Sequence, residues 1–462
     1  MHNIIKQSGV PQYLVVKYNY NGPRYTSYPT ANEFKHICNT KFMESQLKGI
    51  NSSNKLRKFG LYIHIPFCSS LCYYCACNKI ITKNSTIASK YISYLKKEWK
   101  LYNTYLDSNI RLTNVHLGGG SPTFLTDDQL SEIHSIYSGH LISNHSEQSI
   151  EIDPRTVNEG RLIKIKTLGF SRISFGVQDL DPTVQKSINR QQSYHEILEI
   201  ISIARSLSFK SINVDLIYGL PNQTLKSFER TLQKIVKLRP DRLSLYGYAH
   251  LPEIYKSQKI INENTLPSAE EKIQLLREAI NTFCSYGYEY IGMDHFSLPN
   301  DELSTAKKTG ILNRNFQGYT TSHEDIIGLG VSSISQYKTF YVQNEKHLID
   351  YYNRLDINMF PIKKGHALSY DDKIRRAVIM NIMCHGKVYI DAYEQTFQIN
   401  FYKYFALEIK NLKSFSDNNL IVISDKYIEV SKIGWFFIRP IAMVFDQYLR
   451  DKNKIMKFSK VV

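Results

Sequence analysis

The sequence lacks any apolar run of roughly 18 residues, the length that indicates a membrane-spanning helix. The nearest candidate, residues 434–445, is shorter and contains Arg439 and Pro440. Residues 1–25 also lack the basic start, apolar stretch and small-residue cleavage site of a secretory signal peptide. We therefore expect a cytoplasmic protein without a membrane span.

Basic residues form no run or arm, although the formal net charge is +16. Because nucleic-acid-binding segments concentrate Lys and Arg, this scatter predicts no nucleic-acid partner. An anionic substrate or a generally basic surface explains the charge equally well. The sequence also shows no internal repeat and no heptad seam, which argues against a solenoid and favours a monomer.

Cysteine is scarce outside one short segment, because four of the seven cysteines lie within residues 68–77. An odd count with this clustering argues against a disulfide framework and favours a metal site in a reducing compartment. Cys38, Cys284 and Cys384 stand alone, and we expect them to act as small apolar core residues.

The clustered cysteines follow the pattern Cys68-x₃-Cys72-x₂-Cys75. Three thiolates at this spacing can hold three irons of a [4Fe–4S] cluster and leave the fourth iron open. An open iron can bind S-adenosylmethionine (SAM) and reduce its sulfonium, which releases a 5′-deoxyadenosyl radical. The alternative is a zinc site that adds Cys77, but zinc sites more often pair two C-x₂₋₄-C units across a longer loop. We favour the cluster, with Cys77 as a free thiol beside it.

Short β-like runs alternate with longer helical patterns between residues 61 and 248. The β-like runs are 61–65, 114–118, 149–153, 171–177, 212–219 and 242–248. The helical patterns include 86–103, 158–167 and a single long one at 181–207. This alternation predicts parallel strands joined by right-handed crossovers. About six such units indicate an α/β fold with a partial (β/α)₆-type barrel.

We expect the barrel domain to span residues 56–345. Residues 1–55 are too few for a core of their own and are predicted to form an arm or lid lying on the barrel. Residues 346–462 read as amphipathic helices with a short hairpin at 418–431. They predict a separate, mainly helical C-terminal domain.

Glycine and polar residues gather at the expected C-terminal ends of the strands, where barrel enzymes carry their chemistry. They are Gly118–Gly120, Glu151, Asp153, Gln178, Asp179, Asp215 and Tyr248–His250. Glycine allows close backbone approach, so the N–H and C=O groups of the glycine run are candidates to pair with the methionine end of SAM. A ligand ammonium, a ribose hydroxyl or the neighbouring Arg155 would explain buried carboxylates at Glu151 and Asp153, and a purely structural salt bridge is the alternative. Gln178, Arg190 and Asp215 raise the same question, whether they bind a ligand or only a neighbouring side chain.

Three further segments draw attention. Residues 21–34, NGPRYTSYPTANEF, form either a plain surface turn or a lid that contacts an acidic aromatic substrate through Arg24 and the tyrosines. Residues 292–296 and 314–321 mix aromatic, glycine and polar residues, as pocket-lining loops do. Residues 328–333, GLGVSS, lack the last glycine of a dinucleotide-binding motif, so we expect no such site there.

Taken together, these segments resemble the family of bacterial oxygen-independent coproporphyrinogen III oxidases (dehydrogenases), which are radical SAM enzymes. The matching stretches include GPRYTSYPT, IPFCSSLCYYCACNK, GGGSPTFL, EIDPR, GVQDLDPTVQKSINR, NVDLIYGLP, YAHLP, GMDHF and RNFQGYTT, and the similarity covers nearly the whole chain. The resemblance implies oxidative decarboxylation of two propionates of coproporphyrinogen III to vinyl groups, giving protoporphyrinogen IX in haem synthesis. It also implies a reduced flavodoxin- or ferredoxin-type electron donor. The four carboxylates of the substrate would be attracted by the positive net charge of the protein.

The resemblance further implies a [4Fe–4S] cluster on Cys68, Cys72 and Cys75 and two bound SAM molecules. The positions that match first-SAM contacts are Tyr62, Gly119, Glu151 and Ile334, with Tyr74 added by the cluster loop. The positions that match second-SAM contacts are Gly120, Ser121, Gln178, Arg190, Asp215 and Ala249. Ser121 stands where threonine is usual and Ala76 where glycine is common, and both keep a small side chain.

Two other functions are compatible with the cluster. A haem chaperone shares this fold and transfers haem, but such relatives usually have an aromatic residue at the position of Cys77 and lack the 22–30 arm. An enzyme that methylates haem or opens its ring would also carry the cluster, but it would leave the arm unexplained. We therefore favour the decarboxylating oxidoreductase.

Overall fold

The computed structural model describes residues 10–36, 41–51, 57–106, 110–142, 146–322, 324–450 and 458–460. No helix in these ranges is long and apolar enough to cross a membrane. Cys384 is buried in the apolar core and Cys284 packs against it, as expected, whereas Cys38 lies outside the described residues.

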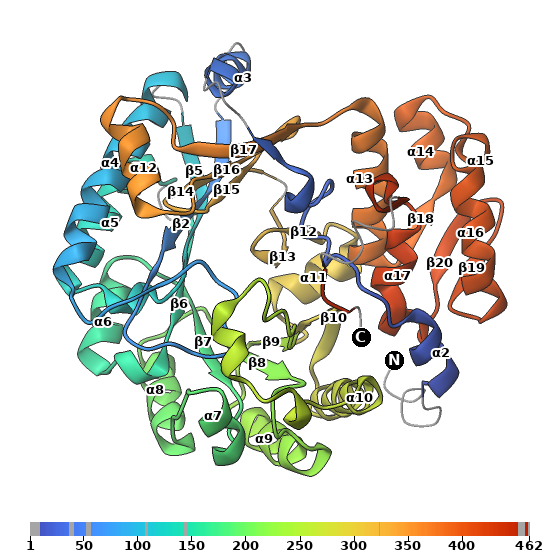
Figure 1. The fold of residues 1–462 in the computed structure, drawn as a ribbon, viewed down its shortest axis with the longest axis horizontal. Helices are drawn as coiled ribbons and strands as arrows, with labels where there is room; N and C mark the ends of the chain where they lie inside the picture. The colour runs from blue at the N-terminus through green and yellow to red at the C-terminus, as the bar shows by residue number, and fades with distance from the viewer. Residues whose placement is uncertain are drawn as a thin grey trace.

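Six parallel strands form the curved centre of a 13-stranded sheet (Figure 1). They are β2 (Arg57–Ile65), β5 (Ile110–Gly119), β6 (Glu147–Ile152), β7 (Arg172–Gln178), β8 (Ser211–Tyr218) and β9 (Arg242–Gly247). Helices cover their outer face: α4 (Thr86–Leu106), α5 (Asp127–Tyr137), α6 (Glu159–Thr167), α8 (Tyr194–Ser206), α9 (Leu225–Leu238) and α10 (Ala269–Ser285). This architecture confirms the predicted α/β class and partial barrel.

The single helix predicted at 181–207 is wrong, because the chain forms α7 (Pro182–Ser187) and α8 with a turn between them. Asn189 adopts a left-handed conformation with φ 54° and donates a hydrogen bond to the carbonyl of Leu71 at 2.7 Å. Ser193 then caps α8 in a capping box with Glu196. The turn directs Arg190 back toward the strand ends, where it donates to the carbonyl of Gly176 at 2.6 Å.

The sheet continues past both edges of the six-stranded centre. Beside β2 lies β14 (Asp325–Leu329), which is also parallel, followed by the antiparallel strands β15 (Ile334–Gln336), β16 (Phe340–Asn344), β17 (Ile362–Ala367) and β1 (Lys35–His36). Beyond β9 lie β11 (His295–Ser297) and β10 (Glu289–Gly292). Because β17 belongs to this sheet and α12 (Leu348–Asp356) packs on α4, we propose that the C-terminal domain begins after residue 367 rather than at 346.

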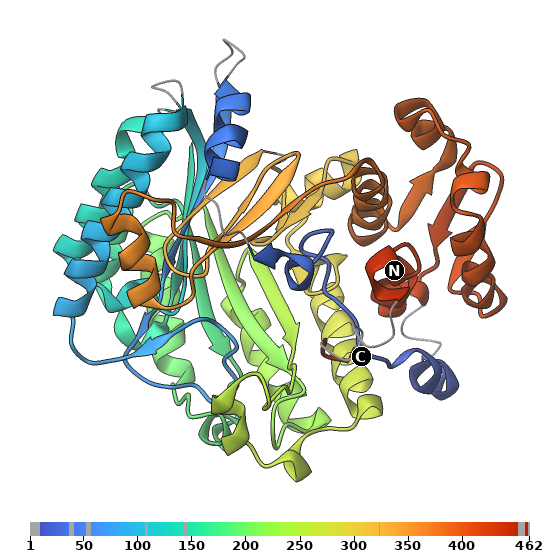
Figure 2. The same ribbon diagram turned by 45° about the horizontal axis from the view of Figure 1, so that its top comes forward.

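The C-terminal domain combines helices with a small antiparallel sheet (Figures 1 and 2). Its helices are α13 (Tyr370–His385), α14 (Ile390–Phe397), α15 (Phe401–Tyr404), α16 (Ala406–Asp417) and α17 (Ile438–Met443). The sheet has the order β18 (Lys387–Tyr389), β20 (Tyr427–Val430) and β19 (Ile421–Ile423). Strands β19 and β20 pair as the hairpin predicted at 418–431.

The short N-terminal elements and the remaining connections complete the fold. They are α2 (Gln12–Tyr18), α3 (Lys41–Asn51), the paired strands β3 (Phe67–Cys68) and β4 (Ile80–Ile81), α11 (Glu302–Thr309), and the hairpin β12 (Asn313–Asn315) and β13 (Gly318–Thr320). Residues 21–34 cross between the barrel and the C-terminal domain, and Figure 2 shows this blue segment between them. One continuous apolar core includes residues of all three parts, such as Tyr25, Phe175 and Ile379.

Candidate active site

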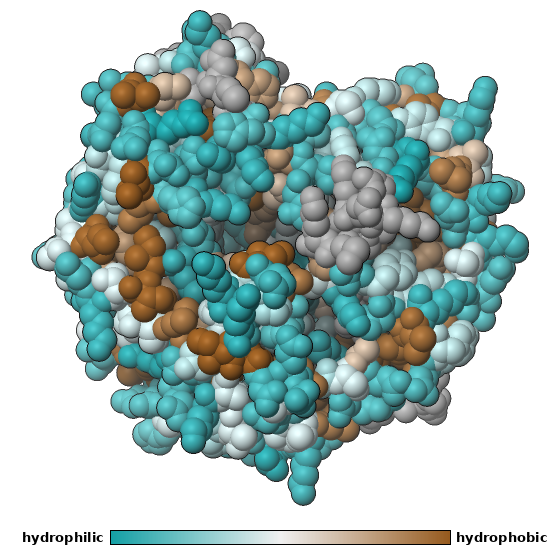
Figure 3. All heavy atoms as spheres, in the orientation of Figure 1, coloured by the Kyte–Doolittle hydropathy of each residue, from teal (hydrophilic) through white to brown (hydrophobic). Residues whose placement is uncertain are grey.

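The cysteine loop forms one wall of a cavity of about 430 Å³ at the C-terminal ends of the barrel strands. Residues from four successive strand ends complete the lining: Gly119, Gly120, Ser121, Glu151, Asp153, Gln178, Arg190 and Asp215. The structure therefore brings together most of the positions that the sequence singled out. The face shown in Figure 3 is hollowed near its centre and is mainly hydrophilic around that hollow.

The three cysteines of the motif have different electrostatic surroundings. A hydrogen bond from Cys77 and the charge of Lys79 lower the pKa of Cys75 to about 6, although burial opposes them. Burial raises the pKa of Cys68 to about 12. Arg190 Nη1 lies 3.6 Å from the sulfur of Cys72 and supplies a positive charge there. Iron binds the thiolate form, so basic groups beside the thiols suit a thiolate-held cluster.

The surroundings of Cys77 argue against its serving as a fourth thiolate ligand. It is exposed and borders three neighbouring cavities, whereas Cys72 is buried. Its hydrogen bond to Cys75 raises the pKa of Cys77 well above the usual value for a thiol.

The glycine run packs its backbone tightly against β2 and β3. Gly119 has φ 117°, and a Cβ atom there would lie 2.6 Å from the ring of His64. The N–H groups of Gly120 and Ser121 donate to Ile65 and Phe67 carbonyls at 2.7 and 2.9 Å, and that of Gly119 donates to Glu151. Protein acceptors thus occupy all three N–H groups, which argues against their pairing with SAM. Pairing of SAM with the carbonyl groups of the glycine run stays a prediction.

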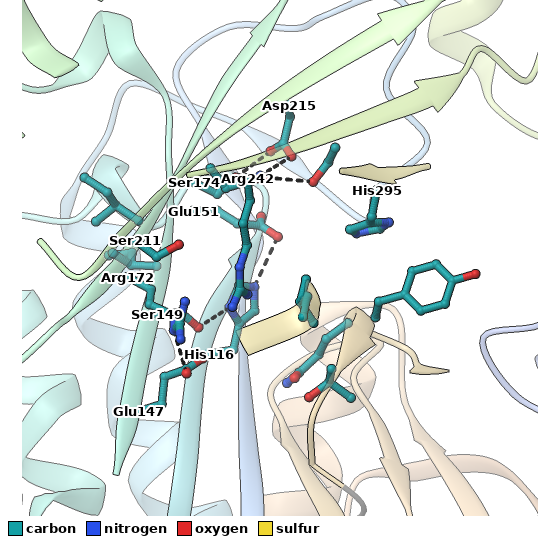
Figure 4. A pocket seen from close by; sticks show the side chains of 18 of the residues that line it. His116, Glu147, Ser149, Glu151, Arg172, Ser174, Ser211, Asp215, Arg242 and His295 are labelled. Carbon is teal, nitrogen blue, oxygen red and sulfur yellow. Dashed lines mark hydrogen bonds and ion pairs between the residues drawn. The ribbon is translucent and has the colours of Figure 1, made fainter. Parts of the chain in front are cut away.

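Glu151 borders both the cysteine-loop cavity and an adjoining pocket of about 180 Å³, in which Figure 4 shows it beside His116 and Asp215. Its Oε2 accepts from the Gly119 N–H at 3.0 Å, and its Oε1 lies 3.3 Å from His116 Nε2. Burial raises the pKa of Glu151, but the hydrogen bonds from His116 and the Gly119 N–H, with the nearby His116 and His64 rings, together outweigh it, so the pKa falls below its ordinary value. The side chain keeps 43% of its surface exposed to the cavity. Glu151 is thus an ionised acceptor for a ligand ammonium or hydroxyl group.

His116 is a site residue that the sequence reasoning missed. Its Nδ1 lies 2.7 Å from Ser149 Oγ, which fixes the ring behind Glu151. Strands β5 and β6 pair His116 with Ser149 in register, and alternation along β6 places Ser149 and Glu151 on one face. The period-two pattern of neighbouring strands was the signal that could have found it.

Asp153 proves to be salt-bridged. It pairs with Arg155 at 2.7 Å and with Arg190 at 3.2 Å, as the structural alternative predicted. These two arginines, together with a backbone hydrogen bond, hold the pKa of Asp153 below its ordinary value against the effect of burial.

Gln178 and Asp215 occupy the far side of the same cavity. Gln178 has a left-handed φ of 71° at an irregularity where β7 pairs with β8. Asp215 accepts from Ser174 Oγ and Asn213 Nδ2, both at 2.8 Å. Burial raises the pKa of Asp215 to about 6, and the charge of Glu151 adds to this effect.

Three further cavities adjoin the first one through shared lining residues, and the smallest, of about 180 Å³, shares Glu151, Ser174 and Asp215 with it. A cavity of about 350 Å³ is bordered by Tyr62, Gly119, Glu151 and Ile334, which are four of the five expected first-SAM positions. Tyr74, the fifth, instead lines the 430 Å³ cavity and a larger one of about 710 Å³. Ala249 borders only the larger cavity, whereas the other five expected second-SAM positions line the 430 Å³ cavity.

The arm closes one side of the 710 Å³ cavity. Residues 22–27 and 30–32 line it together with Tyr246, Tyr248 and Phe316. Arg24 Nη2 lies 3.4 Å from Asp294 Oδ1, and the guanidinium lies 5.9 Å from the Tyr246 ring centre. The segment 314–321 thus contributes Phe316 to the cavity wall, as its composition indicated, whereas the segment 292–296 contributes Asp294 as the ion-pair partner of Arg24.

Comparisons with known proteins agree with this geometry. The Radical SAM superfamily profile matches residues 62–235, and the HemN C-terminal domain profile matches residues 368–437. An oxygen-independent coproporphyrinogen III oxidase of Pseudomonas aeruginosa is 43% identical over 454 residues, which cover 97% of this chain and 98% of the relative. That of Escherichia coli K12 is 41% identical over 451 residues, with the same coverage. The solved structure of the coproporphyrinogen III oxidase HemN from Escherichia coli, described as a radical SAM enzyme, superposes with a TM-score of 0.89 at 39% identity, covering 95% of this chain and 99% of that one.

Proposed function

Since this chain belongs to the family of oxygen-independent coproporphyrinogen III oxidases, we propose how its own residues perform the family reaction. The enzyme oxidatively decarboxylates two propionates of coproporphyrinogen III to vinyl groups and yields protoporphyrinogen IX. When bound, the [4Fe–4S] cluster and SAM supply a 5′-deoxyadenosyl radical that removes a hydrogen atom from the propionate β-carbon. The substrate radical then loses CO₂ and passes one electron to a one-electron acceptor, which leaves the vinyl group. The haem-chaperone alternative is not favoured, because relatives that match 97% of the chain are named as oxidases.

Cys68, Cys72 and Cys75 hold the cluster in this proposal. The support is their shared position on one cavity wall, with Arg190 beside Cys72 and Lys79 donating to the Cys75 carbonyl at 2.8 Å. These positive groups offset the negative charge that three thiolates bring to a partly buried site. Cys77 remains a thiol that donates to Cys75.

Glu151 binds the first SAM through a charge-assisted hydrogen bond to its amino or ribose hydroxyl groups. Tyr62 and Ile334 border the same cavity and shape its apolar side. Gln178, Arg190 and Asp215 hold a second SAM in the adjoining 430 Å³ cavity. Ser121 contributes there through its backbone and small side chain.

The substrate occupies the 710 Å³ cavity beneath the arm. This cavity is the largest of the three adjoining ones, it has an aromatic lining, and it reaches Cys77, Gln178 and Asp215 beside the expected radical source. Arg24 at its wall offers a guanidinium to a propionate carboxylate, because the planar fork of arginine matches a carboxylate. The net charge of +16 favours both this polyanionic substrate and an acidic flavodoxin- or ferredoxin-type donor.

The observation that carries this proposal is the continuity of three cavities that join the cysteine loop, Glu151 and the arm. The test is an anaerobic incubation of the reconstituted protein with dithionite, SAM and coproporphyrinogen III, with porphyrins analysed by mass. Formation of protoporphyrinogen IX supports the proposal. An intact cluster with stoichiometric haem binding and no decarboxylated product would overturn it.

A further inference from the structure

The C-terminal domain holds residues 21–34 of the arm through three successive sets of hydrogen bonds. Arg439, on α17, donates through Nε to the carbonyl of Pro23 at 3.0 Å and through Nη2 to that of Gly22. Tyr25 donates its phenol proton to Asp446 Oδ2 at 2.9 Å, and the N–H of Gln447 donates to Tyr28 Oη at 3.3 Å. These contacts join parts of the chain more than 400 residues apart, since the Tyr25–Asp446 separation is 421.

The contacts are buried and therefore costly to break. Tyr25, Asp446 and Arg439 are 1%, 4% and 7% exposed. A buried hydrogen bond that loses one partner leaves the other group without compensation for its lost hydration. Burial also raises the pKa of Asp446 to about 6, and the Tyr25 hydroxyl partly offsets this by stabilising the carboxylate.

The backbone of the arm is strained at Tyr25. Tyr25 has φ 47°, in the left-handed region that a bulky L-residue rarely adopts. Such a conformation is unfavourable and persists where the surroundings enforce it. Here the two carbonyl acceptors for Arg439 lie two and three residues before the strained residue, whose own side chain is held by Asp446. The C-terminal domain thus fixes the turn of the arm.

The other side of this turn faces the large cavity. Arg24 keeps 34% of its side chain exposed, near Asp294 and the ring of Tyr246. Residues 24–27 all border the cavity, but Arg24 and Thr26 are half-buried, whereas Tyr25 and Ser27 are buried. The direction in which Arg24 points therefore depends on the turn at Tyr25.

We propose that Asp446 and Arg439 are positioning residues for the substrate, acting through the arm. By holding the turn at Tyr25, they keep the Arg24 guanidinium at the wall of the cavity, where it meets a substrate carboxylate. The C-terminal domain thereby sets the affinity for a polycarboxylate without touching it. This inference rests on the proposed location of the substrate in the 710 Å³ cavity.

The first test measures steady-state kinetics of the reconstituted holoenzyme. Tyr25→Phe removes only the hydroxyl group and keeps the ring packing, and Asp446→Ala removes its acceptor. Each change is expected to raise the KM for coproporphyrinogen III about tenfold while the KM for SAM and the iron content stay unchanged. The double variant is expected to match the singles, because both remove one interaction. Tyr137→Phe is the matched control, since it also loses one buried hydroxyl hydrogen bond, to Gln148 at 3.0 Å, far from the arm.

The second test does not depend on the substrate. Brief trypsin treatment of the native holoenzyme, followed by mass analysis, reports cleavage after Arg24. Cleavage is expected to be about tenfold faster in Tyr25→Phe and Asp446→Ala than in the wild type or in Tyr137→Phe. If Asp446→Ala does not fold, Tyr25→Phe alone still decides the question.

The outcomes separate this inference from the proposed function. An unchanged KM in Tyr25→Phe, or effects that multiply in the double variant, would overturn the positioning role while leaving the proposed function intact. A wild-type enzyme that does not decarboxylate coproporphyrinogen III would overturn the proposed function, and the substrate role of the arm with it. Faster cleavage together with a selective rise in KM supports the inference.

Discussion

Arg190 Nη1 lies 3.6 Å from the sulfur of Cys72, so a single guanidinium connects the cysteine loop with the strand ends. The same nitrogen lies 3.2 Å from Asp153, and the other two guanidinium nitrogens donate to the Gly176 carbonyl. Arg190 therefore ties the expected cluster to the expected second-SAM cavity. This relationship leads to the first prediction.

Replacing Arg190 with alanine is expected to spare the cluster and to impair turnover at least tenfold. Arg155 still neutralises Asp153 in this variant, whereas the second-SAM cavity loses the guanidinium that lies between Gly176 and Cys72. Iron and sulfide content and the rate of decarboxylation are the measurements. Arg230→Ala, at an exposed ion pair on α9, is the control. An unaltered rate in Arg190→Ala would exclude the second-SAM assignment.

Cys77 and Cys75 are expected to behave differently on replacement by serine. Cys75→Ser should abolish cluster assembly and SAM cleavage, because a cluster iron loses its thiolate. Cys77→Ser should keep full iron content, because Cys77 is exposed and serves only as a hydrogen-bond donor to Cys75. Iron content and the electron paramagnetic resonance spectrum of the reduced protein distinguish them. Loss of the cluster in both variants would favour four-thiolate binding instead.

His116→Ala is expected to raise the KM for SAM about tenfold without changing the iron content. The imidazole holds Glu151 and lowers its pKa, so its loss frees the carboxylate to move and weakens its charge-assisted bond. His134→Ala, on the outer helix α5, is the control and should leave KM unchanged. Equal SAM affinity in both variants would show that His116 does not position Glu151.

Glu98 provides a pH-dependent prediction about stability. This fully buried carboxylate accepts from Gly330 N–H, Asn344 and Tyr351 at 2.8, 2.6 and 2.6 Å, which anchors the loop before Ile334. Burial raises the pKa of Glu98 from 4.5 to about 7, although the three donors oppose it. The folded state therefore binds a proton more tightly than the unfolded state, so this group lowers stability as pH rises between about 4.5 and 7.

The Glu98→Gln variant tests this linkage because glutamine does not titrate. The Tm of the wild type minus that of Glu98→Gln should fall between pH 5 and 7 and level off near pH 8, as the raised pKa of Glu98 requires. Thermal unfolding at matched buffer strength is the measurement. A difference that stays constant across this range would mean that Glu98 titrates with an ordinary pKa in the folded protein.

The features that could be predicted from the sequence are those that depend on residues close together in the chain. The six parallel strands follow from local periodicity, and the cysteine motif follows from spacing within one loop. Contacts between distant segments were not visible: the Tyr25–Asp446 bond, the Glu98 network, and the addition of β17 to the barrel sheet all join residues far apart in the chain. The break between α7 and α8 was also missed, although the polar residues 189–193 interrupt the apolar periodicity at the turn.

The most direct test of the central claim is the ratio of products in one anaerobic reaction, with 5′-deoxyadenosine and tetrapyrroles quantified together by mass. Radical-initiated removal of two propionate carboxyl groups predicts two deoxyadenosines for each protoporphyrinogen IX, with a tripropionate, monovinyl intermediate rising and falling between. Deoxyadenosine released without loss of carbon dioxide from the tetrapyrrole would contradict the account.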